Sequence, residues 1–300
     1  MANKRVMVAA ACFLAFGLGA RADERPFAFT AVDFPGAVST TAWGINGQGE
    51  VVGSYVDVAG RQHGFVLSGE TFRSIDFPGS VLTDARGISP AGDVVGAYRA
   101  GAPTMTHGYV LTRHGEFLPT DFPGHLNTIL QRIAPDGTIV GCYHDTDTMG
   151  TMHGIVITGE DASALDMPAS MHNGMTPNLS MIVGLYTDME TGKGRAYLVR
   201  NGDFLPFDVP GSTFTAGWDI NPRGDVVGVY RDVAGRFHGF IVDARRQDAP
   251  SEWAFTAIDY PGAAATRAFG INARGDVVGH YVDATGTHGF LASRTRRGNH

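Results

Sequence analysis

A short polar stretch in the middle of the chain carries the residue types of a metal site. His144, Asp145, Asp147 and His153 lie within ten consecutive residues. Imidazole nitrogens and carboxylate oxygens together suit divalent transition metals such as zinc. The stretch therefore predicts a metal site of mixed nitrogen and oxygen ligands. The competing interpretation, which we favour, is a polar hairpin loop that has lengthened without gaining a ligand.

A histidine also recurs at one position along the chain, followed by Gly and then by an apolar residue. The five histidines of this kind are His63, His107, His153, His238 and His288. If the copies surround an axis, equivalent side chains lie on a ring and are too far apart to share one ion at ligand distances of roughly 2 Å. We therefore expect each histidine to bond a neighbouring loop in its blade.

Aspartates recur in short Asp-x-x-Gly loops, which resemble fragments of calcium-binding loops. Examples begin at Asp57, Asp232 and Asp283. Calcium takes about six to eight oxygen ligands, and each loop offers one carboxylate. These aspartates are therefore expected to form turns.

No catalytic motif accompanies these residues. The chain lacks the Gly-x-Ser-x-Gly and His-Glu-x-x-His motifs, the Walker loop and the dinucleotide fingerprint. Cys142 stands in a strand-like run at a position where other copies carry mostly small or apolar residues, which predicts a buried hydrophobe and not a nucleophile. We assign no catalytic residue and no cofactor from the sequence, and a divalent metal is the one cofactor left open.

These residues belong to a motif of roughly 45 residues that occurs six times. Its first landmark is an Asp that precedes a Pro by two residues. The six aspartates are Asp33, Asp76, Asp121, Asp166, Asp208 and Asp259, with spacings of 43, 45, 45, 42 and 51 residues. The last spacing is longer because a polar loop is inserted at 244–252. A second landmark, Gly-x-Tyr, is present in all six copies, from Gly53 to Gly279.

Each copy contains four short β-rich runs, for example 72–77, 85–89, 93–98 and 107–112 in the second copy. The Pro-Gly between copies predicts a type II turn, because Gly accepts the positive φ of its third position. The Asp before this turn is expected to accept backbone N–H bonds across it. Both faces of the runs are apolar or small, which is typical of sheets packed on both faces.

Four strands in each of six copies predict an all-β, six-bladed β-propeller. The alternatives are a β-solenoid and a pair of three-repeat β domains. Within the propeller, we expect the strand near 27–33 to complete the last blade and so to join the two ends of the chain. Otherwise, closure rests on packing alone.

The repeat resembles that of the HAF family of extracellular repeat proteins (HAF-repeat proteins), which is named for a His-Ala-Phe motif. The shared series is Ala-x-Gly-Ile-Asn, Gly-Asp-Val-Val-Gly-x-Tyr, Asp-x-x-Gly and His-Gly-Phe. The last motif reads His63-Gly-Phe65, His238-Gly-Phe240 and His288-Gly-Phe290, with Gly in place of Ala. The resemblance covers essentially the whole chain after the first 22 residues. It implies export and a repeat architecture, and it carries no catalytic residues across.

The first 22 residues have the order of a signal peptide. Basic residues precede an apolar run over 6–18, and Ala20-Arg21-Ala22 offers small residues for cleavage before Asp23. We expect the mature chain in the periplasm or outside the cell. A lipid-modified Cys12 is the alternative, which Ala9 disfavours because Leu is usual three positions before such a cysteine.

The expected division is therefore a signal peptide over 1–22, one propeller domain over 23–293 and a C-terminal tail over 294–300. No other stretch approaches the roughly 20 apolar residues of a membrane helix, so no membrane span is expected. The net charge is −7, and loss of Lys4, Arg5 and Arg21 takes it to −10. This balance argues against a nucleic-acid partner.

The sequence predicts a non-enzymatic binding or interaction module for a protein or carbohydrate partner, with a monomer favoured. The alternatives are a propeller-type hydrolase or lyase with an axial metal, and a structural envelope-associated repeat protein. Functional residues are expected where copies depart from the repeat. These places are 144–153 and 171–180, the second of which includes His172.

Overall fold

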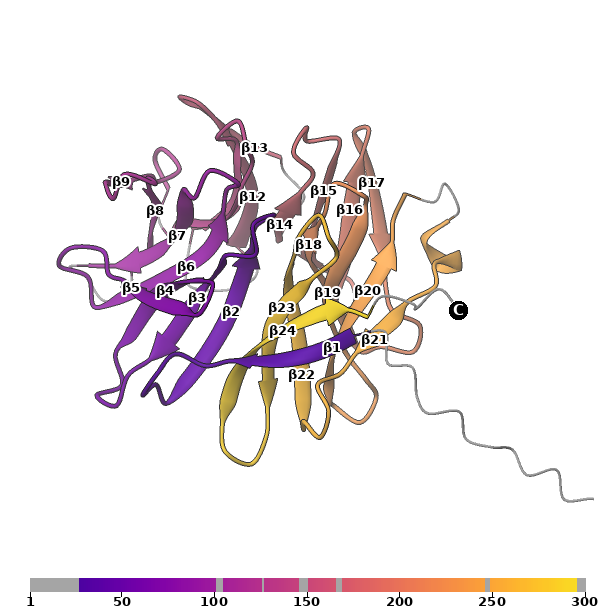
Figure 1. The fold of residues 1–300 in the computed structure, drawn as a ribbon. Helices are drawn as coiled ribbons and strands as arrows, with labels where there is room; N and C mark the ends of the chain where they lie inside the picture. The colour runs from indigo at the N-terminus through magenta and orange to yellow at the C-terminus, as the bar shows by residue number, and fades with distance from the viewer. Residues whose placement is uncertain are drawn as a thin grey trace, which may run out of the picture.

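The computed structural model describes residues 27–100, 105–125, 127–145, 151–165, 169–245 and 249–295. Over these ranges the chain forms 24 strands and one short 3-10 helix, η2(Pro250–Glu252), which lies in the polar insertion. The strands form six four-stranded antiparallel sheets around a central axis (Figure 1). Two of these sheets are joined by one parallel bridge between Gln62 and Leu82. The predicted all-β, six-bladed propeller is confirmed.

Each blade runs outward from an innermost strand. Blade 1 consists of β2(Ser39–Ile45), β3(Val51–Val56), β4(Gln62–Ser68) and β5(Thr71–Ile75). Blade 2 consists of β6(Leu82–Ile88), β7(Val94–Arg99), β8(His107–Leu111) and β9(Phe117–Pro119). Blade 3 consists of β10(Ile129–Ile133), β11(Ile139–His144), β12(Met152–Thr158) and β13(Asp161–Ala164). Blade 4 consists of β14(Ser170–Met175), β15(Met181–Thr187), β16(Gly194–Arg200) and β17(Asp203–Phe207). Blade 5 consists of β18(Phe214–Ile220), β19(Asp225–Arg231), β20(Phe237–Asp243) and β21(Thr256–Ile258). Blade 6 consists of β22(Ala265–Ile271), β23(Val277–Val282), β24(Thr287–Arg294) and β1(Phe27–Val32).

The two ends of the chain meet in blade 6. Strand β1 is the outermost strand of this blade and pairs antiparallel with β24, from Phe27 opposite Arg294 to Val32 opposite Gly289. Figure 1 shows these strands side by side although they are the first and last of the described chain. The closure that we favoured from the sequence is therefore confirmed. No helix in the described residues is long and apolar enough to cross a membrane.

Every innermost strand has a β-bulge at the same place. In blade 1 the register shifts between Ala42 and Gly44, so Trp43 is the extra residue, and the other five blades repeat this shift. The strands come so close here that a Cβ on Gly44 would lie 2.6 Å from the carbonyl oxygen of Arg86 in the next blade. The glycine of the Gly-Ile-Asn motif is thus required by close approach of two backbones.

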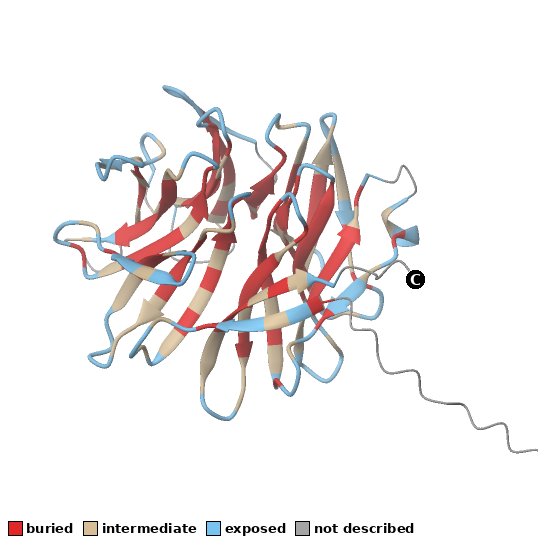
Figure 2. Ribbon diagram, viewed as in Figure 1, coloured by how far each residue is buried: buried red, intermediate tan, exposed pale blue. Residues whose placement is uncertain are grey.

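The glycine of the Gly-x-Tyr landmark is also explained by close packing. A Cβ on Gly228 would overlap the carbonyl oxygen of Ala216 and lie 2.6 Å from the ring of Phe240. The same clash with a carbonyl of the innermost strand arises in every blade. The core consists of layers between blades, where an aromatic ring such as Phe240 or Phe290 fills the space above this glycine. Figure 2 shows this burial along the inner strands and exposure at the loops.

Candidate functional site

The structure places three of the four predicted metal ligands, and Asp147 lies outside the described residues. Asp145 bonds two histidines, because its Oδ1 lies 2.9 Å from Nδ1 of His125 and its Oδ2 lies 3.4 Å from Nε2 of His153. The Nε2 of His144 lies 3.5 Å from the Cys142 thiol instead. Within the described ranges, no group of three or more His, Cys, Asp or Glu side chains is arranged to hold a metal ion.

The contact between Asp145 and His153 is one copy of an arrangement that recurs around the propeller. In blade 1, His63 lies between two aspartates, with Nδ1 2.6 Å from Asp76 and Nε2 3.2 Å from Asp57. Its ring stacks on Tyr55 with the ring centroids 4.9 Å apart. The same arrangement surrounds His238 and His288. The recurring histidines therefore bond neighbouring loops, as the sequence predicts.

Blade 4 builds the same arrangement with an arginine. The Nε of Arg195 lies 2.9 Å from Asp208 and its Nη1 lies 3.6 Å from Asp188. The guanidinium lies over the ring of Tyr186, 6.0 Å from its centroid. Arginine here makes the same three contacts as histidine does in blades 1, 5 and 6. We therefore assign the arrangement to holding the blade together and not to catalysis.

The turn aspartates have a different role from the one expected. The carboxylate of Asp33 bonds Nδ1 of His288 at 3.1 Å, while the N–H of Phe34 is accepted by Oγ1 of Thr40 at 3.0 Å. Four other turns show the same backbone N–H to threonine bond. For the five turn aspartates that the structure describes, the expectation that they accept N–H groups across the turn is therefore wrong, and Asp166 lies outside the described residues. A threonine six residues along supplies that acceptor.

The axis of the propeller is occupied by an ion pair that the sequence analysis missed. The Nε of Arg132 in β10 lies 3.1 Å from Oδ2 of Asp219 in β18, and both side chains are about nine-tenths buried. Each stands directly after the bulge, at the position that is Gly44 in blade 1. Two copies thus carry a charged residue where the other copies carry glycine. A stricter alignment of the repeats would have shown this difference in the sequence.

The Arg132 guanidinium donates four hydrogen bonds to backbone carbonyl oxygens. Its Nη1 donates to the carbonyl oxygens of Arg86 and Gln131 at 2.9 and 2.7 Å. Its Nη2 donates to those of Trp43 and Phe269 at 3.1 and 2.6 Å. The buried Nε faces Asp219 as an ion pair without a hydrogen bond, so four of the five N–H groups of this arginine are used in hydrogen bonds. One side chain thus ties together the innermost strands of blades 1, 2, 3, 5 and 6.

Asp219 is equally well bonded. Its Oδ1 accepts the N–H of Ile220 at 2.9 Å and its Oδ2 accepts the N–H of Ile271 at 3.0 Å. Burial raises the pKa of this carboxyl, whereas the Arg132 guanidinium and the two N–H groups lower it. A metal ion on this axis would have to displace a guanidinium cation that is already paired with the nearest buried carboxylate.

Three aromatic rings pack together beside this ion pair. Trp43 and Trp218 lie 4.4 and 4.8 Å from Phe269, measured between ring centroids. The Arg86 guanidinium lies 4.5 Å above the ring of Trp43 and 3.2 Å from Asp84.

The irregular fourth copy contributes a buried histidine and not an exposed site. His172 is fully buried, and its Nδ1 bonds the hydroxyl of Tyr197. Burial lowers the pKa of His172 to about 4, so the ring is neutral near pH 7. Burial also raises the pKa of the Cys142 thiol to about 12, which agrees with its predicted role as a buried hydrophobe.

Two surface cavities are lined by residues that the structure describes. The first, which we call the side groove, lies between blades 1 and 2 and has a volume of about 470 Å³. Its lining includes Arg73, Glu50, Arg113, Ser74 and the ring of Phe117. Arg73 is exposed and makes no hydrogen bond or ion pair with any residue that the structure describes.

The second cavity, which we call the axial well, opens where the innermost strands end and has a volume of about 170 Å³. One aliphatic side chain from each blade forms its wall, and Arg132 and Asp219 also line it. The six side chains are Ile45, Ile88, Ile133, Met175, Ile220 and Ile271.

No protein-family model matches this sequence. No curated protein sequence matches it either. Solved structures do resemble it. TolB from Acinetobacter baumannii has a TM-score of 0.55 and 13% identity, over 81% of this chain and 63% of TolB. This chain thus spans less than two thirds of TolB.

Two further structures cover most of both chains. The six-bladed lectin of Aleuria aurantia, described with a fucose recognition mode, has a TM-score of 0.53 and 9% identity over 87% of this chain and 93% of the lectin. A gluconolactonase from Xanthomonas campestris has a TM-score of 0.53 and 12% identity over 91% and 96%. At such identities the likeness concerns the fold alone: these comparisons and the sheet order show that the chain is a six-bladed β-propeller.

Proposed function

We propose that this protein is an exported, HAF-type repeat protein that binds a saccharide in the side groove between blades 1 and 2. The observation that carries the proposal is the groove itself. Its volume of about 470 Å³ lies within the usual range of about 300–1,000 Å³ for small-molecule sites. It is the larger of the two cavities described above, and it is lined by charged, polar and aromatic groups.

The chemistry of the lining suits a polyhydroxylated ligand. Arg73 and Arg113 are planar donors that can bond two hydroxyls at once, and Glu50 is a carboxylate acceptor. The half-buried Phe117 offers an apolar ring against which the C–H face of a sugar can pack. Arg73 supports the proposal most strongly, since its donors are not used within the described protein.

The comparisons support a binding role. One similar structure is the fucose-recognising lectin with the same blade number, and a mutant of that same lectin is described in complex with Fucα1-6GlcNAc. The rival hydrolase or lyase with an axial metal is disfavoured by the Arg132 guanidinium on the axis. Metal analysis tests that rival directly, because a tightly held stoichiometric ion that is lost in His144→Ala supports it.

Saccharide binding is tested by calorimetric titration of the mature protein with L-fucose, D-glucose, D-galactose and N-acetylglucosamine. We expect one of these to bind, and Arg73→Ala to weaken it about ten- to a hundredfold, since hydrogen bonds to charged groups contribute about 1.5–3 kcal/mol. Arg231→Ala, an exposed arginine of blade 5, is the matched control and should leave the affinity unchanged. Failure of all four sugars to bind, or equal binding by Arg73→Ala, contradicts the proposal.

A further inference from the structure

The axial well has an apolar wall around a floor with no accessible free donor. Its aliphatic ring includes Ile45, Ile220 and Ile271, all less than a tenth exposed. Below them, the four Nη N–H groups of Arg132 are bonded to carbonyl oxygens, and its buried Nε faces Asp219 at 3.1 Å as an ion pair. Because this Nε is buried, Arg132 offers no accessible free donor to a polar ligand group, and the well suits an apolar one.

The polar residues at the mouth of the well are also satisfied. Asn46, Asn221 and Asn272 follow the aliphatic ring in blades 1, 5 and 6, and each side-chain oxygen accepts two backbone N–H groups of its own turn. Their amide nitrogens join neighbouring blades, from Asn221 to the carbonyl of Asn272 and from Asn272 to that of Asn46. These asparagines shape the mouth and leave no donor for a ligand.

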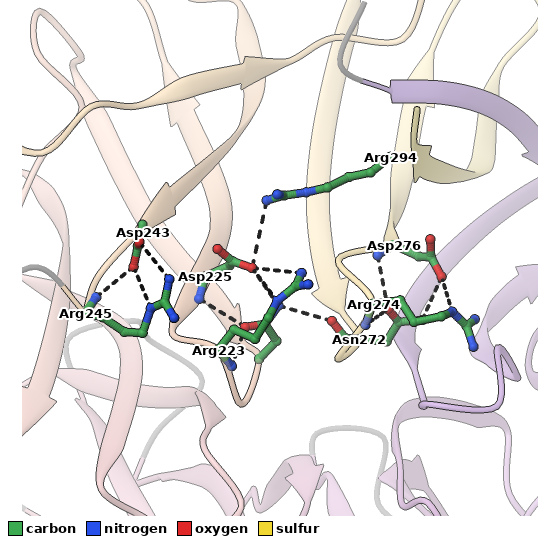
Figure 3. Close-up of polar contacts among 9 residues, drawn as sticks. Arg223, Asp225, Asp243, Arg245, Asn272, Arg274, Asp276 and Arg294 are labelled. Atoms are coloured by element: carbon green, nitrogen blue, oxygen red, sulfur yellow. Dashed lines mark hydrogen bonds and ion pairs between the residues drawn. The ribbon is translucent and has the colours of Figure 1, made fainter. Parts of the chain in front are cut away.

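Unused positive charge stands next to the mouth, on blades 5 and 6 only. Arg223 and Arg274 follow Pro222 and Ala273, which line the well. Arg274 lies 2.9 Å from Asp276. Arg223 and Arg294 share one carboxylate, at 3.1 and 3.8 Å from Oδ2 of Asp225 (Figure 3). These three guanidiniums therefore face two carboxylates.

Arg223 and Arg294 also come close to one another. A Cβ placed on Gly275 would lie 2.6 Å from Nη2 of Arg223 and 3.1 Å from Nε of Arg294. Figure 3 shows the two side chains reaching the Asp225 carboxylate, Arg223 from the turn between β18 and β19 and Arg294 from β24. Two neighbouring guanidiniums that share one carboxylate leave positive charge for a second anionic group. The nearby pair of Asp243 and Arg245 is balanced and adds none.

We propose that the axial well binds the aliphatic chain of a small carboxylate, whose anionic head pairs with Arg223 and Arg294. The chain lies among the six aliphatic side chains, and the carboxylate remains at the mouth. The volume of about 170 Å³ is close to the roughly 150 Å³ of an apolar cavity that holds benzene, so about six carbons fit inside. This site is separate from the side groove and does not depend on the saccharide proposal.

The experiment is a calorimetric titration of the mature protein with butanoate, hexanoate and octanoate. Each buried methylene contributes about 0.8 kcal/mol, so the affinity should rise about fourfold for each methylene and level off once about six carbons are inside. Octanol provides the comparison for the charged head. Absence of octanoate binding at millimolar concentration, or an affinity that does not depend on chain length, overturns the proposal.

Two variants separate the contribution of the apolar wall to octanoate binding from that of the guanidinium charge. Ile133→Phe fills the well from a half-buried wall position and should abolish octanoate binding, with its melting temperature recorded to show that it folds. Arg294→Gln should weaken octanoate about two- to fivefold and leave octanol unchanged, as expected of an exposed ion pair. Arg113→Gln, in the side groove, is the control for charge. Equal loss of octanoate and octanol in Arg294→Gln contradicts the role of the guanidinium.

Discussion

Arg132 and Asp219 come from blades 3 and 5 and meet on the axis of the propeller, with Nε and Oδ2 3.1 Å apart. In the other four blades this position is Gly44, Gly87, Gly174 or Gly270. The two large side chains fit because these glycines leave the room. Four glycines and one buried ion pair thus close the channel at this level. With strict sixfold symmetry, the carbonyl groups of the six innermost strands would face one another across it.

Asp219→Ala should destabilise the protein by about 3–5 kcal/mol, because it leaves a buried guanidinium without its carboxylate. Arg132→Met should have a similar cost, since it leaves Asp219 unpaired and removes four bonds to carbonyls. Urea unfolding of both single variants and of the double variant measures the coupling. Additive single effects would show that the two residues do not act as a pair.

Gly228→Val should destabilise by about 2–4 kcal/mol, because the added atoms overpack a buried contact. The new Cβ would overlap the carbonyl oxygen of Ala216 and press on the ring of Phe240. Gly47→Ala is the control, since a Cβ at Gly47 meets nothing within 4 Å. Thermal unfolding should show a large drop for the first and little change for the second. An unchanged melting temperature for Gly228→Val contradicts the packing argument.

The blade architecture was predictable because its sequence motif recurs six times. Recurrence of Gly228 and its equivalents, of the Pro-Gly turns and of the four β-rich runs gave the strand number, the blade number and the closure by β1. The contact of Asp33 was not predictable, because Asp33 and His288 are 255 residues apart and meet only when the ring closes. The other turn aspartates that the structure describes contact partners nearby in the sequence, as Asp76 contacts His63, but across a strand pair and not within the turn. Local turn chemistry suggested a nearby N–H group, and a threonine takes that bond.

The stability of the protein should fall as the pH falls below about 6.5, in part because of His172. Its pKa is about 4 in the folded protein, against 6.5 when unfolded. Between these values the unfolded chain binds a proton that the folded protein does not, so acid favours unfolding. His172→Leu, which copies Leu130 of blade 3, removes this effect. The stability difference between wild type and variant should change by up to about 1.4 kcal/mol per pH unit between pH 6 and 4.5.

A second histidine with a lowered pKa, the half-buried His280, makes the control necessary. His280, with a pKa of about 3, titrates in the same sense, so His172→Leu should reduce the slope of stability against pH without removing it. His114→Leu replaces an exposed histidine and is the control for the removal of one imidazole. Urea unfolding at half-unit pH steps gives the three slopes. Parallel curves for wild type and His172→Leu would falsify the assignment of a neutral buried ring.

The candidate sites were less predictable than the fold, because both cavities depend on how different copies are placed together. Arg73 lies in blade 1 and Arg113 in blade 2, and nothing in either copy marks them as neighbours of one groove. The same holds for Arg223 and Arg294. Irregular loops gave only a partial signal: Asp145 and His153 are in contact, but as one copy of the general arrangement of His63 with its two aspartates.

That arrangement gives the last prediction. His63→Ala should destabilise by about 1–2 kcal/mol, since it removes bonds to Asp57 and Asp76 and the stacking on Tyr55. His63→Arg should recover most of this loss, because Arg195 occupies the same place in blade 4 between two aspartates and over a tyrosine. Urea unfolding at pH 7 distinguishes the two substitutions. If arginine is as damaging as alanine, the position requires an imidazole, and a role for His63 beyond holding its blade together would follow.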